Sequence, residues 1–236
     1  TQLIPVLGYT FSGWHADGLH DMHRGLPVLT TMYNPMKWQT RGGGQTLFTS
    51  GVKALERLET DLIDELRECV VAYMRSPNDE YPDEFRRINS GPSYMTDDGT
   101  RRVGFGADPH DASAGLRDFT LTHEHAIGGG RHPCIYRHPV TGQESLYVSP
   151  CKSVYLLDAT SGEMRHDIEE TVELLSKALW PSAKKGVRYE HHWKEGDFVA
   201  WLNTLTLHSA TDPVDIEGSR LMHRVRLSTP IAEKCW

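Results

Sequence analysis

Hydrophobic and polar residues follow different periods along the first third of the chain. Residues 26–33 form an unbroken apolar and β-branched run that ends at an Asn-Pro turn, which predicts a buried strand. After a triple glycine at 42–44, residues 45–49 predict a second short strand. Between residues 50 and 75 the apolar positions recur every three or four residues, which predicts one or two helices packed on a sheet.

The second half of the chain carries a clear helix signal between strands. Asp167 followed by Glu170 predicts a capping box, and the helix it starts is expected to span residues 168–180 and end at Pro181. Short strands are predicted over residues 145–149 and 154–157.

Towards the C-terminus the pattern becomes strand-like again. Residues 187–203 predict a hairpin whose turn lies at 194–197. Residues 220–228 alternate strictly, which places Arg220, Arg224 and Arg226 on one face of a predicted last strand. Many strands with helices outside them predict an α+β or β-sandwich fold.

Residues 76–130 show no sustained period and are rich in Asp, Gly, Pro and Arg. They predict an irregular excursion, and both an active-site lid and a disordered loop fit such a segment. The whole chain, residues 1–236, is otherwise expected to form one domain around one core.

Composition and charge narrow the class of partner. The formal net charge is −7 and no segment is strongly basic, so neither nucleic acid nor an anionic membrane is an expected partner. A small molecule is expected instead, and the sequence leaves both a monomer and a homo-oligomer open. The four cysteines form no C-x-x-C pair, which predicts free thiols in a reducing, cytoplasmic compartment.

Candidate metal chemistry begins with His15 and Asp17, which are two residues apart and share a face if the chain is extended. A His-x-Asp triplet is weak evidence by itself, but His208 follows the predicted hairpin as a third candidate. Two imidazoles and one carboxylate leave open positions on a metal, which suits a ferrous ion that must also bind a chelating cosubstrate and dioxygen.

The other histidine clusters are interpreted as polar turn or surface residues. Adjacent histidines on a strand point to opposite faces, so His191 and His192 cannot easily share one ion. The remaining candidates, considered and set aside in favour of a solvated role, are His20, Asp21, His23, His123, Glu124 and His125.

A family resemblance rests on six runs in a fixed order. They are WHADG, LPVLTTMYNP, GGGQTLFTSGVKALERL, RHPVTGQESLYVS, GDFVAWLNTLTLHSA and RLMHRVRLS. Together they resemble the taurine dioxygenase family of iron(II)- and 2-oxoglutarate-dependent dioxygenases. The resemblance implies a double-stranded β-helix, or jelly-roll, whose two sheets enclose the iron.

The resemblance also implies residue roles. His15, Asp17 and His208 match the iron ligands. Thr46 matches the hydroxyl donor to the distal carboxylate of 2-oxoglutarate, and Arg220 matches the arginine that pairs with that carboxylate. Arg224 matches an arginine near the inner carboxylate and the anionic group of the substrate. The implied reaction consumes O2 and 2-oxoglutarate, releases succinate and CO2, and oxidises an unactivated C–H bond.

Departures from the family pattern bear on the substrate. Phe11 stands where taurine-specific members carry an asparagine, so taurine is not the expected substrate. Lys152 lies in a stretch that replaces an aromatic wall. With Phe11, Trp14 and Arg224, Lys152 is expected to line the pocket of a small anionic substrate such as an amino acid or carboxylate. The family's segment before His-x-Asp also looks missing, since only fourteen residues precede His15.

Alternative functions stay open at this point. The same iron chemistry can lead to desaturation, cyclisation or oxidative decarboxylation. A zinc hydrolase could use the same three ligands, but such an enzyme would have no obvious role for Arg220 and Arg224. A non-catalytic jelly-roll binding protein is the third class.

Overall fold

The computed structural model describes residues 14–18, 27–73, 93–95, 101–103, 131–149, 153–211 and 216–228 of the 236-residue chain. Most of the predicted excursion at 76–130 lies outside these residues. Within it, β4 (Ser93–Met95) and β5 (Arg101–Val103) pair antiparallel. The single-domain arrangement stays a prediction.

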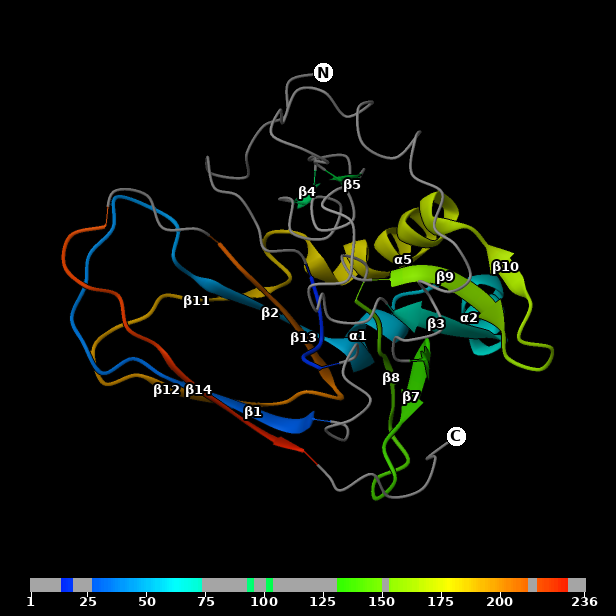
Figure 1. Ribbon diagram of the computed structural model, residues 1–236, viewed down its shortest axis with the longest axis horizontal. Coiled ribbons are helices and arrows are strands. Elements are labelled where there is room, and N and C mark those ends of the chain that lie inside the picture. The colour runs from blue at the N-terminus through cyan, green and yellow to red at the C-terminus, as the bar shows by residue number, and fades with distance from the viewer. Residues whose placement is uncertain are drawn as a thin grey trace, which may run out of the picture.

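Two three-stranded antiparallel sheets form the layers that enclose the site. One has the order β12-β1-β14, with β1 spanning Pro27–Tyr33, β12 spanning Phe198–Leu202 and β14 spanning His223–Ser228. The other has the order β11-β2-β13, with β2 spanning Thr46–Ser50, β11 spanning Tyr189–His191 and β13 spanning Thr206–Ala210. Figure 1 shows them as two layers on the left of the molecule. Neighbouring strands are distant in sequence, as in a double-stranded β-helix.

A third sheet and the helices lie beside these layers (Figure 1). The sheet has the order β10-β9-β3-β6, with β3 spanning Cys69–Tyr73, β6 Arg131–Pro133, β9 Ser153–Asp158 and β10 Met164–His166. The helices are α1 (Gly51–Leu55), α2 (Thr60–Arg67) and α5 (Ile168–Ala183), and a two-stranded pair joins β7 (Ile135–Arg137) to β8 (Glu144–Leu146). No helix in the described part of the chain is long and apolar enough to span a membrane.

The main apolar core lies between α5, the third sheet and the enclosing layers. It includes Leu66, Val71, Leu146, Leu156 and Leu179, each at most 1% exposed. Burying aliphatic side chains of this size stabilises the fold by roughly 1.5–3 kcal/mol each. This core holds the third sheet and α5 against the strands that carry the candidate site.

The prediction of helix up to residue 75 is wrong at its end. Residues 51–67 do form two short helices, but Cys69–Tyr73 is a strand that pairs with β9 and β6. The run Cys-Val-Val-Ala-Tyr fits either period over five residues. Residues 69–73 form a strand because they hydrogen-bond to neighbouring strands on both edges.

The predicted hairpin at 187–203 is also wrong, although both of its strands form. β11 pairs with β2 and β12 pairs with β1, so the turn between them carries the chain from one sheet to the other. Gly196 allows this turn with a φ of +84°. Each strand finds its partner in a different layer, which local pattern alone does not reveal.

The capping box at Asp167 is confirmed, because its carboxylate accepts from Glu170 N–H while the Glu170 carboxylate accepts from Asp167 N–H. The helix does not stop at Pro181, however, but continues to Ala183. Leu179 and Ala183 are buried on either side of the proline, and their packing outweighs one missing N–H in the last turn. The last strand is shorter than predicted, since β14 begins at His223 and leaves Arg220 before it.

Candidate metal centre

Three predicted ligands come together between the two enclosing layers. His15 and His208 form a two-way backbone bridge, with N–H to O distances of 2.9 Å in each direction. Asp17 follows two residues later, and its Oδ1 lies 3.9 Å from Nε2 of each histidine. One ligand atom from each residue lies within 4.8 Å of the others. No other group in the described residues brings three such atoms together.

The charge state of Asp17 suits a metal ligand. Burial alone would raise the pKa of its carboxyl, since only 4% of the residue is exposed. His208, His15 and Arg224 nearby, together with the hydrogen bond from Thr30, outweigh burial and lower that pKa below its usual value. The carboxylate is therefore ionised at neutral pH.

Thr30 of β1 orients this carboxylate. Its hydroxyl donates to Asp17 Oδ2 over 3.1 Å, which leaves Oδ1 facing the two imidazoles. Thr30 is fully buried, so this bond is shielded from competing water. A hydrogen-bonded partner of this kind fixes the direction in which a ligand oxygen points.

Aromatic side chains pack around His208. The Phe48 ring stacks at 6.2 Å between centroids and the Trp201 ring lies tilted at 5.0 Å. His208 is 5% exposed, so its imidazole sits in apolar surroundings. Packing against both rings limits how far the imidazole can turn.

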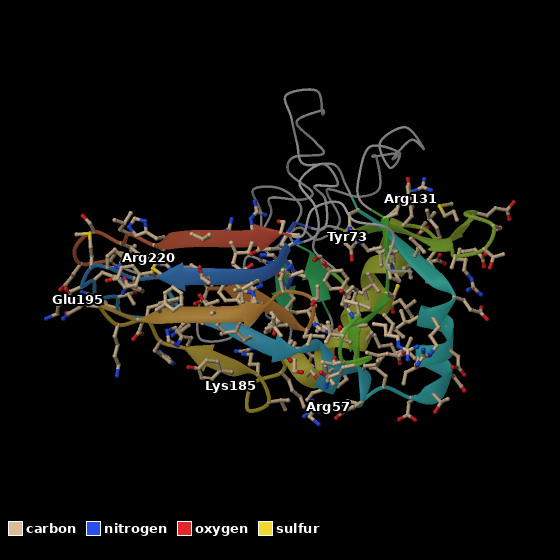
Figure 2. All side chains as sticks on the ribbon, turned by 90° about the horizontal axis from the view of Figure 1, so that it is seen from below. Arg57, Tyr73, Arg131, Lys185, Glu195 and Arg220 are labelled. Atoms are coloured by element: carbon tan, nitrogen blue, oxygen red, sulfur yellow. The ribbon has the colours of Figure 1, made fainter. Side chains whose placement is uncertain are left out.

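The residues assigned to 2-oxoglutarate lie around the start of β2. Thr46 is 3% exposed, and its Oγ1 accepts a 2.9 Å hydrogen bond from the Trp193 indole. That bond leaves the Thr46 hydroxyl hydrogen available to a ligand oxygen. Arg220 stacks over the Trp38 ring at 5.0 Å, and its guanidinium donates to Gly44 O over 3.4 Å. Figure 2 shows Arg220 at the end of the layers that also carries Glu195, away from Tyr73.

Arg224 and Arg226 both lie on the site face of β14. Arg224 Nη1 is 3.4 Å from Asp17 Oδ1. Arg226 pairs in register with Thr30, the residue that holds Asp17, and its Nη1 lies beside the Gly18 turn. The sequence alternation placed Arg224 and Arg226 on one face, but only the structure shows that the face is turned towards Asp17.

The other candidate residues fall into two groups, those outside the described residues and those in the core or on the surface. Phe11 and Lys152 lie outside the described residues, as do His20, Asp21, His23 and the run at 123–125. Trp14 is 6% exposed and belongs to the main apolar core, and its contact with a substrate stays a prediction. His191 contacts the Tyr189 hydroxyl and the Asp197 carboxylate, which fits the structural role expected for it.

The sequence interpretation missed the neutral residues that hold the segment of the candidate ligands His15 and Asp17. Thr30, Ser149 and Asn203 are all fully buried and all bond to residues 16 or 17. A buried polar side chain inside a predicted apolar strand, such as Thr30 in β1, was a signal that could have been used.

Gly18 closes the turn after Asp17 and offers a direct test of it. Its φ is +76°, and an added Cβ would lie 2.5 Å from Pro27 Cγ. We expect Gly18→Ala to lower the free energy of unfolding by about 1 kcal/mol for the left-handed backbone plus about 1–3 kcal/mol for the clash. Urea denaturation of the metal-free protein measures the change.

Gly162→Ala is the matched control for Gly18→Ala. Gly162 has a φ of +73°, yet an added Cβ there would meet no atom within 4 Å. In Gly162→Ala the loss in free energy of unfolding is therefore expected to come from the left-handed backbone alone. Equal losses of unfolding free energy in the two variants would mean that Pro27 moves away from the added Cβ and that the Gly18 turn is not tightly packed.

The family model for "Taurine catabolism dioxygenase TauD, TfdA family" matches residues 4–226. The chain belongs to this family. It is 30% identical over 186 residues to the alpha-ketoglutarate-dependent xanthine dioxygenase xan-1 of Neurospora crassa, covering 78% of this chain and 40% of that protein. It is 27% identical over 186 residues to the pentalenolactone F synthase of Streptomyces avermitilis, covering 78% of this chain and 51% of that protein. The chain thus spans about half the length of these curated relatives.

Solved structures of the same fold confirm the predicted double-stranded β-helix. AAD-2 in complex with Mn(II) and N-oxalylglycine superposes with a TM-score of 0.60 at 18% identity, covering 93% of this chain and 70% of that one. A taurine dioxygenase from Burkholderia xenovorans gives 0.55 at 19% identity, covering 91% and 56%. The predicted TauD/TfdA resemblance is confirmed, and the relatives fit the class of Fe(II)- and 2-oxoglutarate-dependent dioxygenases that act on small molecules.

Proposed function

We propose that this chain is an Fe(II)- and 2-oxoglutarate-dependent dioxygenase that oxidises an unactivated C–H bond of a small anionic molecule. The observation that carries the proposal is the group of His15, Asp17 and His208 inside the jelly-roll of a TauD/TfdA family member. When bound, the iron supplies the redox chemistry by which O2 and 2-oxoglutarate oxidise the substrate and yield succinate and CO2.

The donor set fits a ferrous ion. Two imidazole nitrogens and one carboxylate oxygen within 4.8 Å of one another are the ligands of a facial site, which keeps other positions open for exchangeable ligands. Asp17 is ionised, and Thr30 restrains the oxygen that does not face the histidines. These residues bind and orient the ion, while Phe48 and Trp201 keep water from His208.

Thr46 and Arg220 are proposed to hold the distal carboxylate of 2-oxoglutarate. A guanidinium offers two parallel donors to a carboxylate, and a hydroxyl adds a third. The Trp193 indole fixes the Thr46 hydroxyl, and the Trp38 ring supports the Arg220 guanidinium. Both aromatic contacts reduce the freedom that cosubstrate binding must otherwise restrict.

An anionic substrate is proposed from the charges on β14. Arg224 and Arg226 lie two residues apart on the site face, and within the described residues Arg226 forms no ion pair. Like charges held this close favour an anion between or above them. Phe11, Trp14 and Lys152 are proposed as further substrate contacts on the family resemblance alone.

A biosynthetic outcome is the second candidate. One relative is named as a pentalenolactone F synthase, which supports a role in the synthesis of a product. Desaturation, cyclisation and oxidative decarboxylation would use the same ligands. The zinc hydrolase and binding-protein alternatives lose support, because family relatives are named as alpha-ketoglutarate-dependent enzymes.

A cytoplasmic location is proposed on the state of the cysteines. Cys69 and Cys134 are both buried free thiols, and burial raises the pKa of each thiol, which keeps them protonated. Free thiols of this kind suit a reducing compartment.

The test is succinate release by the iron-loaded protein with 2-oxoglutarate and a panel of small acids. We expect at least one carboxylate or sulfonate to stimulate release above the uncoupled rate, and its neutral amide or ester to be inactive. Stimulation by neutral compounds alone would contradict the anionic substrate. Absence of 2-oxoglutarate turnover with every compound, in a protein that binds iron, would contradict the activity itself.

A further inference from the structure

The backbone of the His-x-Asp segment leaves its β-partner immediately after His15. The bridge to His208 is a single residue pair, and the chain turns at Asp17 and Gly18. Ala16 and Asp17 are nevertheless 1% and 4% exposed. Their peptide groups therefore need partners other than a sheet ladder or water.

The side chain of Asn203 supplies those partners for Asp17. Its Oδ1 accepts from Asp17 N–H over 2.8 Å, and its Nδ2 donates to Asp17 O over 2.9 Å. The same Nδ2 donates to Pro27 O over 3.2 Å. Only one orientation of the carboxamide satisfies an N–H and two carbonyls at once, so its assignment follows from the partners.

Asn203 is itself fixed in place. It is fully buried in the turn between β12 and β13, and its N–H donates to Val28 O over 2.9 Å. This turn leads directly into β13, which carries His208 five residues later. Asn203 therefore ties the backbone of one proposed ligand to the strand that carries another.

Ser149 acts in the same way on the residue between His15 and Asp17. Its Oγ accepts from Ala16 N–H over 3.0 Å and donates to Ala16 O over 3.4 Å. Ser149 is also fully buried, and its own N–H donates to the Tyr73 hydroxyl over 3.1 Å. Two neutral side chains thus replace the missing ladder over two consecutive residues.

We propose that Asn203 is a positioning residue that holds Asp17 at the angle required for metal binding, with Ser149 as its weaker counterpart. The inference rests on the proposed metal site. A carboxamide can satisfy a peptide group as a neighbouring strand would, yet it carries no charge that would compete for the ion. Restraining the Asp17 backbone on both sides limits the rotations that would swing its carboxylate away from His15 and His208.

Anaerobic titration with Fe(II), followed by calorimetry, tests this role without relying on turnover. We expect Asn203→Ala to weaken iron binding by about 10- to 100-fold, the usual cost of losing a residue that orients a ligand. Urea denaturation of the metal-free variants measures stability separately. A folded Asn203→Ala protein that binds Fe(II) as the unaltered protein does would overturn the proposal.

Ser145→Ala is the matched control. Ser145 is fully buried, and its hydroxyl donates to Thr204 O over 2.7 Å in the same turn, but it makes no bond to residues 15–17. We expect it to lower stability while keeping iron affinity within about threefold of the unaltered protein. Equal loss of affinity in Ser145→Ala and Asn203→Ala would reduce Asn203 to a structural residue and overturn the proposal.

Ser149→Ala keeps the proposal testable if Asn203→Ala does not fold. It frees the Ala16 peptide while leaving the turn at 203 intact, and we expect an affinity loss of about 3- to 10-fold, larger than the change of less than about threefold expected for Ser145→Ala. Identical affinities for these two serine variants would overturn the shared positioning role. Failure of the unaltered protein to bind Fe(II) would instead contradict the proposed metal site, so the two failures are distinguishable.

Discussion

Replacing His208 or Asp17 with alanine is expected to abolish iron binding and, with it, succinate release. Losing a residue that merely orients a ligand costs about 10- to 100-fold in affinity, so losing a ligand should cost more than about 100-fold. The Asp17 variant also removes the anion that Arg224 and Thr30 contact, which leaves the cation without its charge partner. Anaerobic Fe(II) titration and a succinate assay on the same samples measure both effects.

His208→Gln accompanies the alanine variant because His208 fills space beside Phe48 and Trp201. Glutamine keeps most of the bulk but offers an amide in place of the imidazole nitrogen. We expect it to remain folded and still to lose iron. Retention of tight iron binding by both His208 variants would remove this residue from the site.

His20→Ala and His23→Ala are the controls from the same stretch of sequence. Both are expected to keep iron binding, because neither was assigned as a ligand despite their proximity in sequence to His15. Loss of iron in either of them, with retention in His15→Ala, would overturn the ligand assignment.

Local signals in the sequence predicted the elements whose causes are local. The Asn-Pro turn after β1 and the Asp167 capping box both involve residues within a few positions of one another. The end of the strand at Tyr33 and the start of the helix at Ile168 were both predicted correctly. Residues 69–73 were assigned to a helix because a five-residue apolar run fits both periods. Its true state depends on β6 and β9, which begin 58 and 80 residues after the end of β3.

The candidate site shows the same difference between residues with local signals and residues whose role depends on distant contacts. His15, Asp17 and His208 have distinctive chemistry and a recognisable spacing, so sequence alone nominated all three. Asn203 was within a quoted motif, yet a neutral amide is common in turns, and nothing local says that it bonds 186 positions away to Asp17. A residue that positions a metal-binding side chain through hydrogen bonds to its backbone can be identified only from the folded structure.

Arg220→Gln is expected to raise the 2-oxoglutarate concentration needed for half-saturation by about 100-fold. The change leaves a carboxylate without its charged partner beside the buried Thr46, and such losses cost about 2–5 kcal/mol. Glutamine keeps an amide donor but ends before the guanidinium carbon, so the contact of that carbon with the Trp38 ring is lost as well. Calorimetric titration of 2-oxoglutarate into the anaerobic Fe(II) protein measures binding without a substrate.

Arg226→Gln separates cosubstrate binding from substrate binding. Arg226 lies beside Gly18, whereas Arg220 reaches Gly44 near Thr46, so the two arginines serve different parts of the site. We expect Arg226→Gln to keep 2-oxoglutarate affinity within about threefold while raising the requirement for the anionic substrate about 10-fold or more. An Arg220 variant with unchanged 2-oxoglutarate affinity would contradict its role, and the reverse pattern in the two variants would exchange their assignments.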